Sequence, residues 1–216
     1  GQGAHSAFAQ FAAEALDIPV DKISVIASDT ATSGNSGSAS ASRLTFMSGN
    51  SIIGAAKVAL EKWHKEERPA VGEFTYLAPK TTPFTPVTGE GKPNFTYGYV
   101  AEAISCEVDR ETGLVSIDQV ICANDVGMAV NPMQVEGQIE GAVVQAAGYT
   151  NLENFITKDG YPQTKLLSTY LIPTVLDIPN KVHSLIHEHA DSLGPYGARG
   201  MGEMPYLPYA PAVCDA

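Results

Sequence analysis

The sequence predicts an α+β fold in which helices pack on a mixed, mainly antiparallel sheet. Two stretches with apolar residues at helical spacing, 4–16 and 40–67, precede two β-rich runs, 97–108 and 113–123. The two runs flank a short turn-like loop, an arrangement typical of a β-hairpin. Helices and strands alternate without the regular rhythm of a β-α-β fold, which favours the α+β class over α/β.

The first half of the chain is predicted to be mainly helical. A helix is expected over 4–16, where apolar side chains recur every three or four residues, and a strand over 22–28. The loop 29–39 that follows consists of small and polar side chains. It leads into a long second helix, which we expect to begin at Ser40 and to reach about Glu67.

The segment 71–96 is richer in proline, threonine and glycine and is predicted to be a connector with one strand at 73–77. After the hairpin, a third helix is predicted from Asn131, its N-cap, with Pro132 in the first helical position, where proline is tolerated. The expected domain organisation is one part of a single domain over 1–216, with this connector inside it.

The third helix contains two glycines, Gly137 and Gly141, four residues apart on one face. Each weakens a helix by roughly 1 kcal/mol relative to alanine. We therefore expect another backbone or a ligand to approach this face closely. Two further strands are predicted at 165–175 and 181–189.

Composition limits the partners and the location. The net charge of −11 disfavours nucleic acid and anionic membrane surfaces, and no apolar run approaches the length of a membrane span. Three cysteines, an odd number without repeated spacing, fit buried, reduced thiols in a cytoplasmic protein better than a disulfide framework or a zinc site. The chain opens without methionine and is expected to be a piece of a longer polypeptide.

Four segments have small or amide residues where a core would need large apolar ones, namely 1–3, 38–42, 137–141 and 197–203. A helix start lined by serines suits an anion such as phosphate, and glutamine suits a polar heterocycle because it both donates and accepts. Each segment alone fits ordinary capping or tight packing. Their joint occurrence favours a large polyanionic cofactor, with Glu203 beside its reactive end. The glycine spacing around Glu203 is not that of a Rossmann dinucleotide site.

Two other groups of side chains are weaker candidates. Three histidines, His183, His187 and His189, would share one face of the last predicted strand. At about 3.3 Å per residue the outer two stand roughly 20 Å apart, so a solvated face is favoured over a metal site. Glu136 and Glu140 could flank a substrate, but simple exposure on the helix is favoured.

The four segments resemble, in order, the C-terminal molybdopterin-binding region of the large subunit in the xanthine dehydrogenase and aldehyde oxidoreductase family, the molybdenum hydroxylases. The matching motifs are Gly-Gln-Gly-x-His at 1–5, Ser-Ala-Ser-Ala-Ser-Arg at 38–43, Asn-Pro through Gly-Gln-Ile-Glu-Gly at 131–141, and Gly-Ala-Arg-Gly-Met-Gly-Glu at 197–203. The similarity covers nearly the whole chain and is weakest between 71 and 93.

The resemblance implies an enzyme that hydroxylates an aldehyde or N-heterocycle with oxygen derived from water, with Glu203 as general base. It assigns no residue of this chain as a direct metal ligand. The Ser-Arg-Leu-Thr-Phe-Met sequence is closer to the bacterial aldehyde oxidoreductase branch, whose cofactor is a cytosine dinucleotide. The residues that the resemblance places at the molybdopterin cofactor are Gln2, Gly3, Ser40, Ala41, Ser42, Arg43, Gln138, Gly200, Met201 and Gly202.

The resemblance also implies partners that these 216 residues do not contain. These are the remaining domains or subunits of the enzyme, with iron–sulfur clusters and, in some members, FAD. The chain alone is therefore expected to be inactive. The alternative is a non-catalytic, molybdopterin-binding-like module that serves subunit assembly, and the molybdenum and pterin content of the full complex distinguishes the two.

Overall fold

The computed structural model describes residues 2–216, so Gly1, the first residue of the Gly-Gln-Gly-x-His motif, lies outside the described residues. The chain divides into two compact units. Unit 1 contains the described residues up to Gly98 together with Val126–Asn131 and Glu188–Gly200, and unit 2 contains Tyr99–Asp125, Pro132–His187 and Met201–Ala216. Helices and a mixed sheet are both present, which confirms the predicted α+β class.

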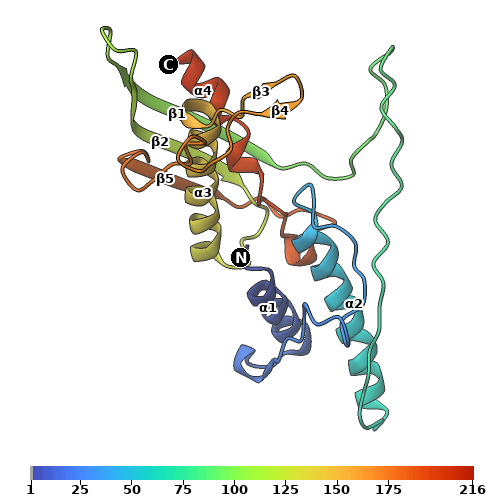
Figure 1. Cartoon of the computed structure of the whole chain (residues 1–216). Helices are drawn as coiled ribbons and strands as arrows, with labels where there is room; N and C mark the ends of the chain where they lie inside the picture. Colours follow the sequence, from blue (N-terminus) through green and yellow to red (C-terminus); the bar gives the residue numbers. More distant parts are fainter. Residues whose placement is uncertain (1) are drawn as a thin grey trace. The chain divides into compact units, whose positions relative to one another are not determined.

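Unit 1 is built on two helices, α1 (Ala4–Leu16) and α2 (Leu44–His64), which lie side by side (Figure 1). The rings of Phe11 and Phe46 are almost completely buried and are the largest apolar side chains of its core. Gly49 on α2 allows Pro195 of the short helix η3 (Pro195–Gly197) to approach, because a Cβ at Gly49 would collide with the proline ring. The core of unit 1 therefore depends on segments far apart in sequence.

The first helix has the predicted bounds, but the strand predicted at 22–28 is wrong. Asp17 adopts a left-handed conformation with φ 53° and ends α1, and the N–H of Ile18 bonds back to the Ala13 carbonyl. Lys22 closes the short helix η1 (Val20–Lys22), and the residues after it pair with no strand. The exposed fraction of Ile26 is 74%, so this β-branched side chain covers little apolar surface.

The second helix begins at Leu44, four residues after the predicted Ser40, and ends at His64 rather than near Glu67. Ala41 and Ser42 have φ of 58° and 53°, which a right-handed helix excludes. The serine-rich segment is consequently a turn before the helix and not its first turn.

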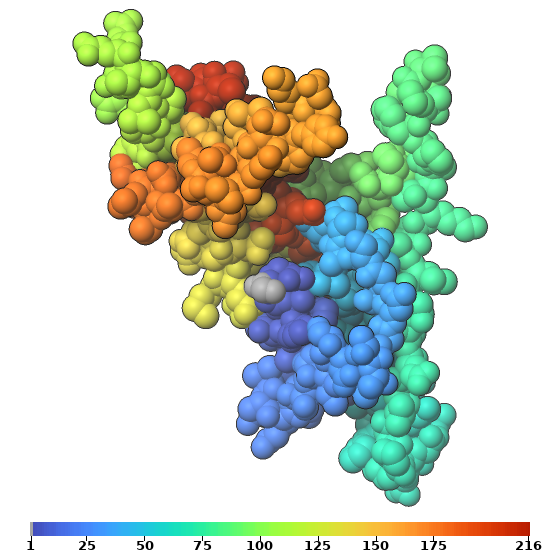
Figure 2. Space-filling model, viewed as in Figure 1, coloured from blue at the N-terminus to red at the C-terminus, as the bar shows by residue number. Residues whose placement is uncertain are grey.

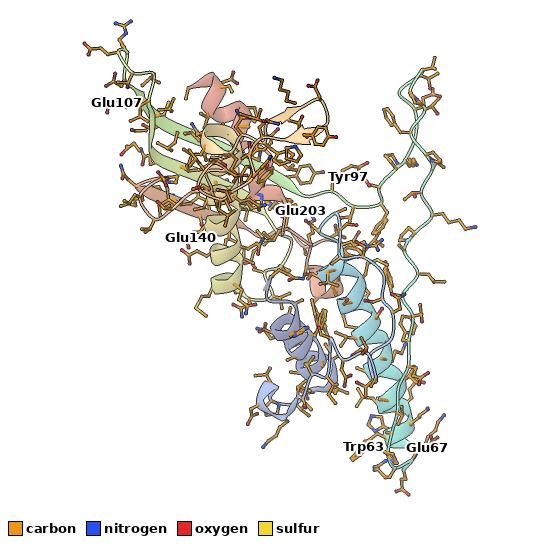
Figure 3. The ribbon with its side chains drawn as sticks, in the orientation of Figure 1. Trp63, Glu67, Tyr97, Glu107, Glu140 and Glu203 are labelled. Atoms are coloured by element: carbon orange, nitrogen blue, oxygen red, sulfur yellow. The ribbon has the colours of Figure 1, made fainter. Side chains whose placement is uncertain are left out.

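The segment 71–96 contains no helix, and the strand predicted at 73–77 does not form. Its first part follows α2 (Figure 1), where Gly72 lies against the Ala55 carbonyl and the ring of Phe74 covers Gly54. Trp63 lies near the end of α2, where Figure 3 labels it. The Arg68 guanidinium stacks on its indole, 3.3 Å from the ring centroid. The later part lies at the surface, where the connector is coloured teal to green in Figure 2.

Unit 2 contains a three-stranded sheet with the order β1-β2-β5. The strands β1 (Tyr99–Val108) and β2 (Val115–Asp125) form the predicted antiparallel hairpin, and β5 (Lys181–His187) pairs parallel to β2. A second, two-stranded antiparallel sheet joins β3 (Thr157–Lys158) and β4 (Tyr161–Pro162). The sheets are therefore mixed and mainly antiparallel, as predicted.

Helices cover the three-stranded sheet. The long helix α3 (Pro132–Ala147) has the predicted start and continues into the π-helix η2 (Gly148–Leu152), and the chain ends in η4 (Met204–Tyr206) and α4 (Tyr209–Asp215). The core is formed by fully buried side chains of β2, α3 and α4, which are Val120, Cys122, Ile139, Val143 and Tyr209.

Two further expectations for unit 2 are wrong. The segment 165–175 is a turn and not a strand, because the N–H groups of Thr169 and Tyr170 both donate to the Leu166 carbonyl. All three cysteines are free thiols as expected, but only Cys122 is fully buried, and Cys214 is exposed near the end of the short helix α4. None of the described helices combines the length and apolar character that crossing a bilayer would require.

Candidate cofactor-binding site

In unit 2 the structure brings the glutamine of the third motif to the backbone beside Glu203. The side chain of Gln138, on α3, donates from Nε2 to the carbonyl oxygen of Gly202 at 2.8 Å. This bond joins residues 64 positions apart in sequence. It fixes the backbone position of the residue immediately before Glu203.

The backbone of Glu203 is also anchored on its other side. Glu203 directly precedes η4, whose Met204 and Pro205 are buried. The N–H of Met204 donates to the Met201 carbonyl at 3.2 Å, and the N–H of Tyr206 donates to the Glu203 carbonyl. The Glu203 side chain itself is exposed (Figure 3), so a firmly held backbone presents a carboxylate at the surface of unit 2.

In unit 1 the serine-rich turn lies directly against the glycine loop. A Cβ at Gly200 would collide with the Ser42 carbonyl oxygen, so these two backbones touch. The sign of φ changes from 53° at Ser42 to −81° at Arg43. Such a turn directs successive N–H groups to one side and forms a concavity that suits anions. The Arg43 side chain closes the turn by donating from Nε to the Ser38 carbonyl at 2.8 Å.

The predicted site residues form two sets, one in each unit. Unit 1 holds Gln2, Gly3, Ser40, Ala41, Ser42, Arg43 and Gly200, and unit 2 holds Gln138, Met201, Gly202 and Glu203. Gly3 has φ 79° and stands at the start of α1, where its carbonyl accepts the Ala7 N–H. Gln2 is exposed and Met201 is buried.

The face of α3 that carries Gly137 and Gly141 is open. Within unit 2, no described atom would contact a Cβ at either glycine, so the expected approach of another backbone is not found there. Glu136 and Glu140 are exposed, as favoured. Of the three histidines, His189 lies beyond the end of β5, and residues 2–216 place no group of three His, Cys, Asp or Glu side chains suitable for a metal ion.

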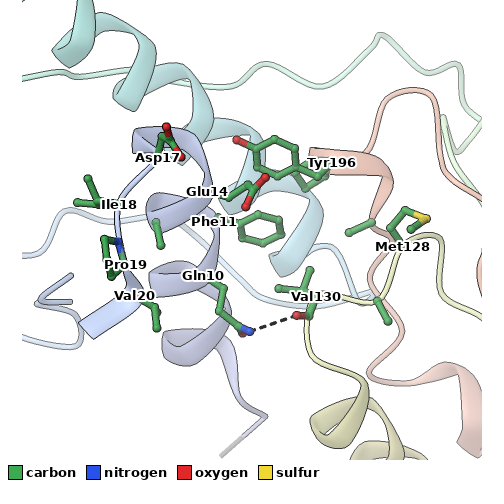
Figure 4. A pocket seen from close by; sticks show the side chains of 14 residues that line it. Gln10, Phe11, Glu14, Asp17, Ile18, Pro19, Val20, Met128, Val130 and Tyr196 are labelled. Carbon is green, nitrogen blue, oxygen red and sulfur yellow. Dashed lines mark hydrogen bonds between the residues drawn. The ribbon is translucent and has the colours of Figure 1, made fainter. Parts of the chain in front are cut away.

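Unit 1 contains a cleft of about 710 Å³ that the sequence did not predict (Figure 4). It lies between α1, η1 and the segments 128–130 and 195–198. The Gln10 amide spans one wall by donating to the Val130 carbonyl at 3.2 Å, and Tyr196 has a left-handed backbone with φ 50°. No motif in the sequence indicates it, because Gln10 and Glu14, four residues apart on α1, are typical of an ordinary exposed helix face.

The mixed sheet covered by α3 defines an α+β domain of the kind found in the solved structures of aldehyde oxidoreductase. The structure of aldehyde oxidoreductase from Desulfovibrio gigas is similar to it over 100% of this chain and 25% of that chain, with a TM-score of 0.82 and 30% identity. Quinoline 2-oxidoreductase from Pseudomonas putida 86 is similar over 100% of this chain and 32% of that chain, with a TM-score of 0.82 and 26% identity.

More particularly, the chain belongs to the family described as the molybdopterin cofactor-binding domain, which matches residues 1–71 and 63–179. It is 32% identical to the aldehyde oxidoreductase of Megalodesulfovibrio gigas, 33% to a probable xanthine dehydrogenase chain of Bacillus subtilis (strain 168), and 29% to a probable hypoxanthine oxidase of Escherichia coli (strain K12). In each case all of this chain is aligned, and it spans 25%, 33% and 26% of the relative's length.

Proposed function

We propose that this chain forms part of a molybdenum hydroxylase that inserts water-derived oxygen into an aldehyde or an N-heterocycle. Its membership of the molybdopterin cofactor-binding family supports this, as do relatives named as aldehyde, xanthine, hypoxanthine and quinoline oxidoreductases. The observation that carries the proposal is the hydrogen bond from Gln138 to Gly202, because it links two of the four motifs beside Glu203.

The residues present fit a large, phosphate-bearing cofactor. In unit 1, the Ser42–Arg43 turn offers backbone N–H groups to an anion, and we assign contacts with the pterin or its dinucleotide phosphate to it together with Gly3, Ser40, Ala41 and Gly200. We assign a pterin contact to Gln2. In unit 2, the open glycine face of α3 leaves room for close approach, and we assign pterin contacts to Gln138, Met201 and Gly202. We propose the cytosine dinucleotide form of the cofactor.

When bound, molybdopterin supplies the oxygen transfer and the two-electron redox chemistry. The chain contributes the base: the carboxylate of Glu203 accepts the proton from the attacking water-derived oxygen as that oxygen becomes nucleophilic. An exposed carboxylate on an anchored backbone suits this task, because the base must reach the reacting oxygen without losing its position.

The electrons then leave through parts of the enzyme outside this chain. We propose iron–sulfur clusters, and FAD in some assemblies, in the remaining domains or subunits, and a cytoplasmic location in keeping with the three free thiols. Because the chain spans only 25% to 33% of the length of the three relatives compared above, we expect no turnover from it alone.

The test is Glu203→Gln in the full enzyme, with Glu111→Gln in the hairpin turn as the matched control. Glutamine keeps the size of the side chain but cannot accept the proton, so turnover should fall by about 10²–10⁴-fold while molybdenum and pterin content stay constant. Turnover near that of the control would remove Glu203 from this role. A full complex that never contains molybdenum or pterin would favour the assembly module.

A further inference from the structure

A row of polar side chains crosses the sheet of unit 2 on the face covered by α4. Glu102 of β1 is the register partner of Cys122 on β2, and Cys122 is the partner of Ser184 on β5. Asn124 lies two residues beyond Cys122 and therefore on the same face. Tyr209 of α4, which packs on β1, lies close enough for the Glu102 charge to affect its hydroxyl. Cys122, Asn124 and Tyr209 are fully buried.

Most polar atoms of this cluster have no hydrogen-bond partner among the described residues. These atoms are both carboxyl oxygens of Glu102, Oδ1 of Asn124, the Ser184 hydroxyl and the Tyr209 hydroxyl. Within the cluster, Asn124 Nδ2 donates to the Cys122 sulfur at 3.1 Å, and the Cys122 thiol lies close enough to Glu102 to influence its carboxyl group. Buried polar groups are nearly always bonded, so the concentration of five such atoms in one cluster, two of them the carboxyl oxygens of Glu102, requires an explanation.

Among the described residues, no cation offsets the effect of burial on Glu102. The titratable groups around it are the Cys122 thiol on β2, the Tyr209 hydroxyl on α4 and, farther along its own strand, Cys106. The side chains buried on α3 are apolar, and so are those of η4. His183 lies next to Ser184 in β5 and therefore points to the opposite face.

Burial raises the pKa of Glu102 from 4.5 to about 6, an effect that the Cys122 thiol partly offsets. Burial, and then the neighbouring Glu102, also raise the pKa values of the Cys122 thiol and the Tyr209 hydroxyl, both to about 12. Glu102 is therefore the one member of the cluster that changes charge near neutral pH.

We propose that protonation of Glu102 controls the packing of α4 on the sheet of unit 2. When Glu102 is neutral, α4 packs closely on the sheet, and when Glu102 is ionised, this packing loosens around Cys122. Because the folded pKa lies above the unfolded one, the stabilisation is complete below about pH 4.5 and is lost as the pH rises through about 6. This pH-dependent packing goes beyond the proposed function and does not depend on it.

The test uses Cys122 as the reporter of opening and the exposed Cys214 as the internal reference. The full protein is treated with a dipyridyl disulfide, which modifies thiols in mild acid, and both cysteines are quantified by peptide mass spectrometry. The ratio of Cys122 to Cys214 modification should rise roughly tenfold between pH 4.5 and pH 6.5. This is less than the full pKa shift would give, since the Glu102 side chain is partly exposed.

Two variants assign the effect. Glu102→Gln should abolish the pH dependence of the ratio, because an amide cannot ionise. Glu107→Gln, an exposed glutamate on the same strand, should leave it intact. A flat ratio in the wild-type protein would overturn the proposal without need of any variant. A rise that persists in Glu102→Gln would also overturn it, since another group would then control the opening.

Discussion

Gly200 is a residue where the missing side chain decides the structure. The Ser42 carbonyl occupies the space that a Cβ would need, and both residues belong to the same unit. Gly200→Ala should therefore lower the free energy of unfolding by about 3 kcal/mol or more, as overpacking against backbone does. Chemical unfolding of the full protein measures this. Gly34→Ala is the control and should be near neutral, because nothing lies within 4 Å of its Cβ position.

Asp191 holds a polar cluster in unit 1. Its Oδ2 accepts from the Thr96 hydroxyl at 2.6 Å and from Arg199 Nε at 3.1 Å, and its Oδ1 accepts the Leu193 N–H. Burial by itself would raise the pKa of Asp191, but these donors outweigh it and the net shift is downward. The carboxylate thus stabilises the fold at neutral pH, and this contribution is lost as the pH falls below the ordinary value of 3.8.

Asp191→Asn should lower the free energy of unfolding by about 2 kcal/mol at pH 7, because an amide oxygen replaces the charged acceptor of the Thr96 and Arg199 hydrogen bonds. The difference from wild type should shrink at pH 3, because the unfolded carboxyl, with its ordinary pKa of 3.8, is then largely protonated and the wild-type stabilisation is partly lost. Urea unfolding at the two pH values measures both quantities. Asp21→Asn, in an exposed pair with Lys22, should change little, and an equal loss in both variants would contradict the assigned role.

At the scale of elements, the sequence predicted those with a complete local signal. The helix at 4–16, the hairpin and the helix starting at Pro132 each carry their own periodicity and end signals. The runs 22–28 and 165–175 have strand-like composition, but a strand also needs a partner, which composition does not reveal. The predicted start of α2 was wrong because Ala41 and Ser42 adopt left-handed backbone conformations, which alanine and serine rarely adopt.

The candidate site, like the secondary structure, could be predicted from the sequence only in part. Motif order pointed to the Gln138 and Gly202 segments, which the structure joins by a hydrogen bond. The polar row from Glu102 through Cys122 to Ser184 was not predictable, because it depends on strand register and on a parallel strand far along the chain. Register is set by the whole sheet and not by any local pattern.

The glycine face of α3 allows a test at the element scale. Gly137→Ala should stabilise the cofactor-free protein by about 1 kcal/mol through helix propensity. It should also reduce the molybdopterin content of the full enzyme, if the cofactor approaches this face as proposed. Glu140→Ala is the control, because it introduces alanine at an exposed position of the same helix. It should leave the molybdopterin content unchanged. Equal cofactor content in both variants would contradict the assigned face.

At the scale of the whole molecule, the chain passes between the two units five times, the last time between Gly200 and Met201. Unit 1 therefore contains segments on both sides of the exposed connector. A single tryptic cut after Lys80 should leave the fragments associated, because α2 still packs on Pro195 through Gly49. Native size-exclusion chromatography and a denaturing gel measure this, and separate elution of the fragments would contradict it.

Because the chain passes between the two units five times, recombination between related genes can exchange parts of this domain only at a cost in packing. Genetic recombination exchanges one continuous stretch of coding sequence, whereas each unit here is encoded in three separate stretches. A crossover within the stretch that encodes these residues therefore yields units that combine segments of two different parent proteins, and these segments must pack together. Exchange of specificity between relatives by shuffling should succeed with breakpoints outside residues 1–216 and should fail with most breakpoints inside them.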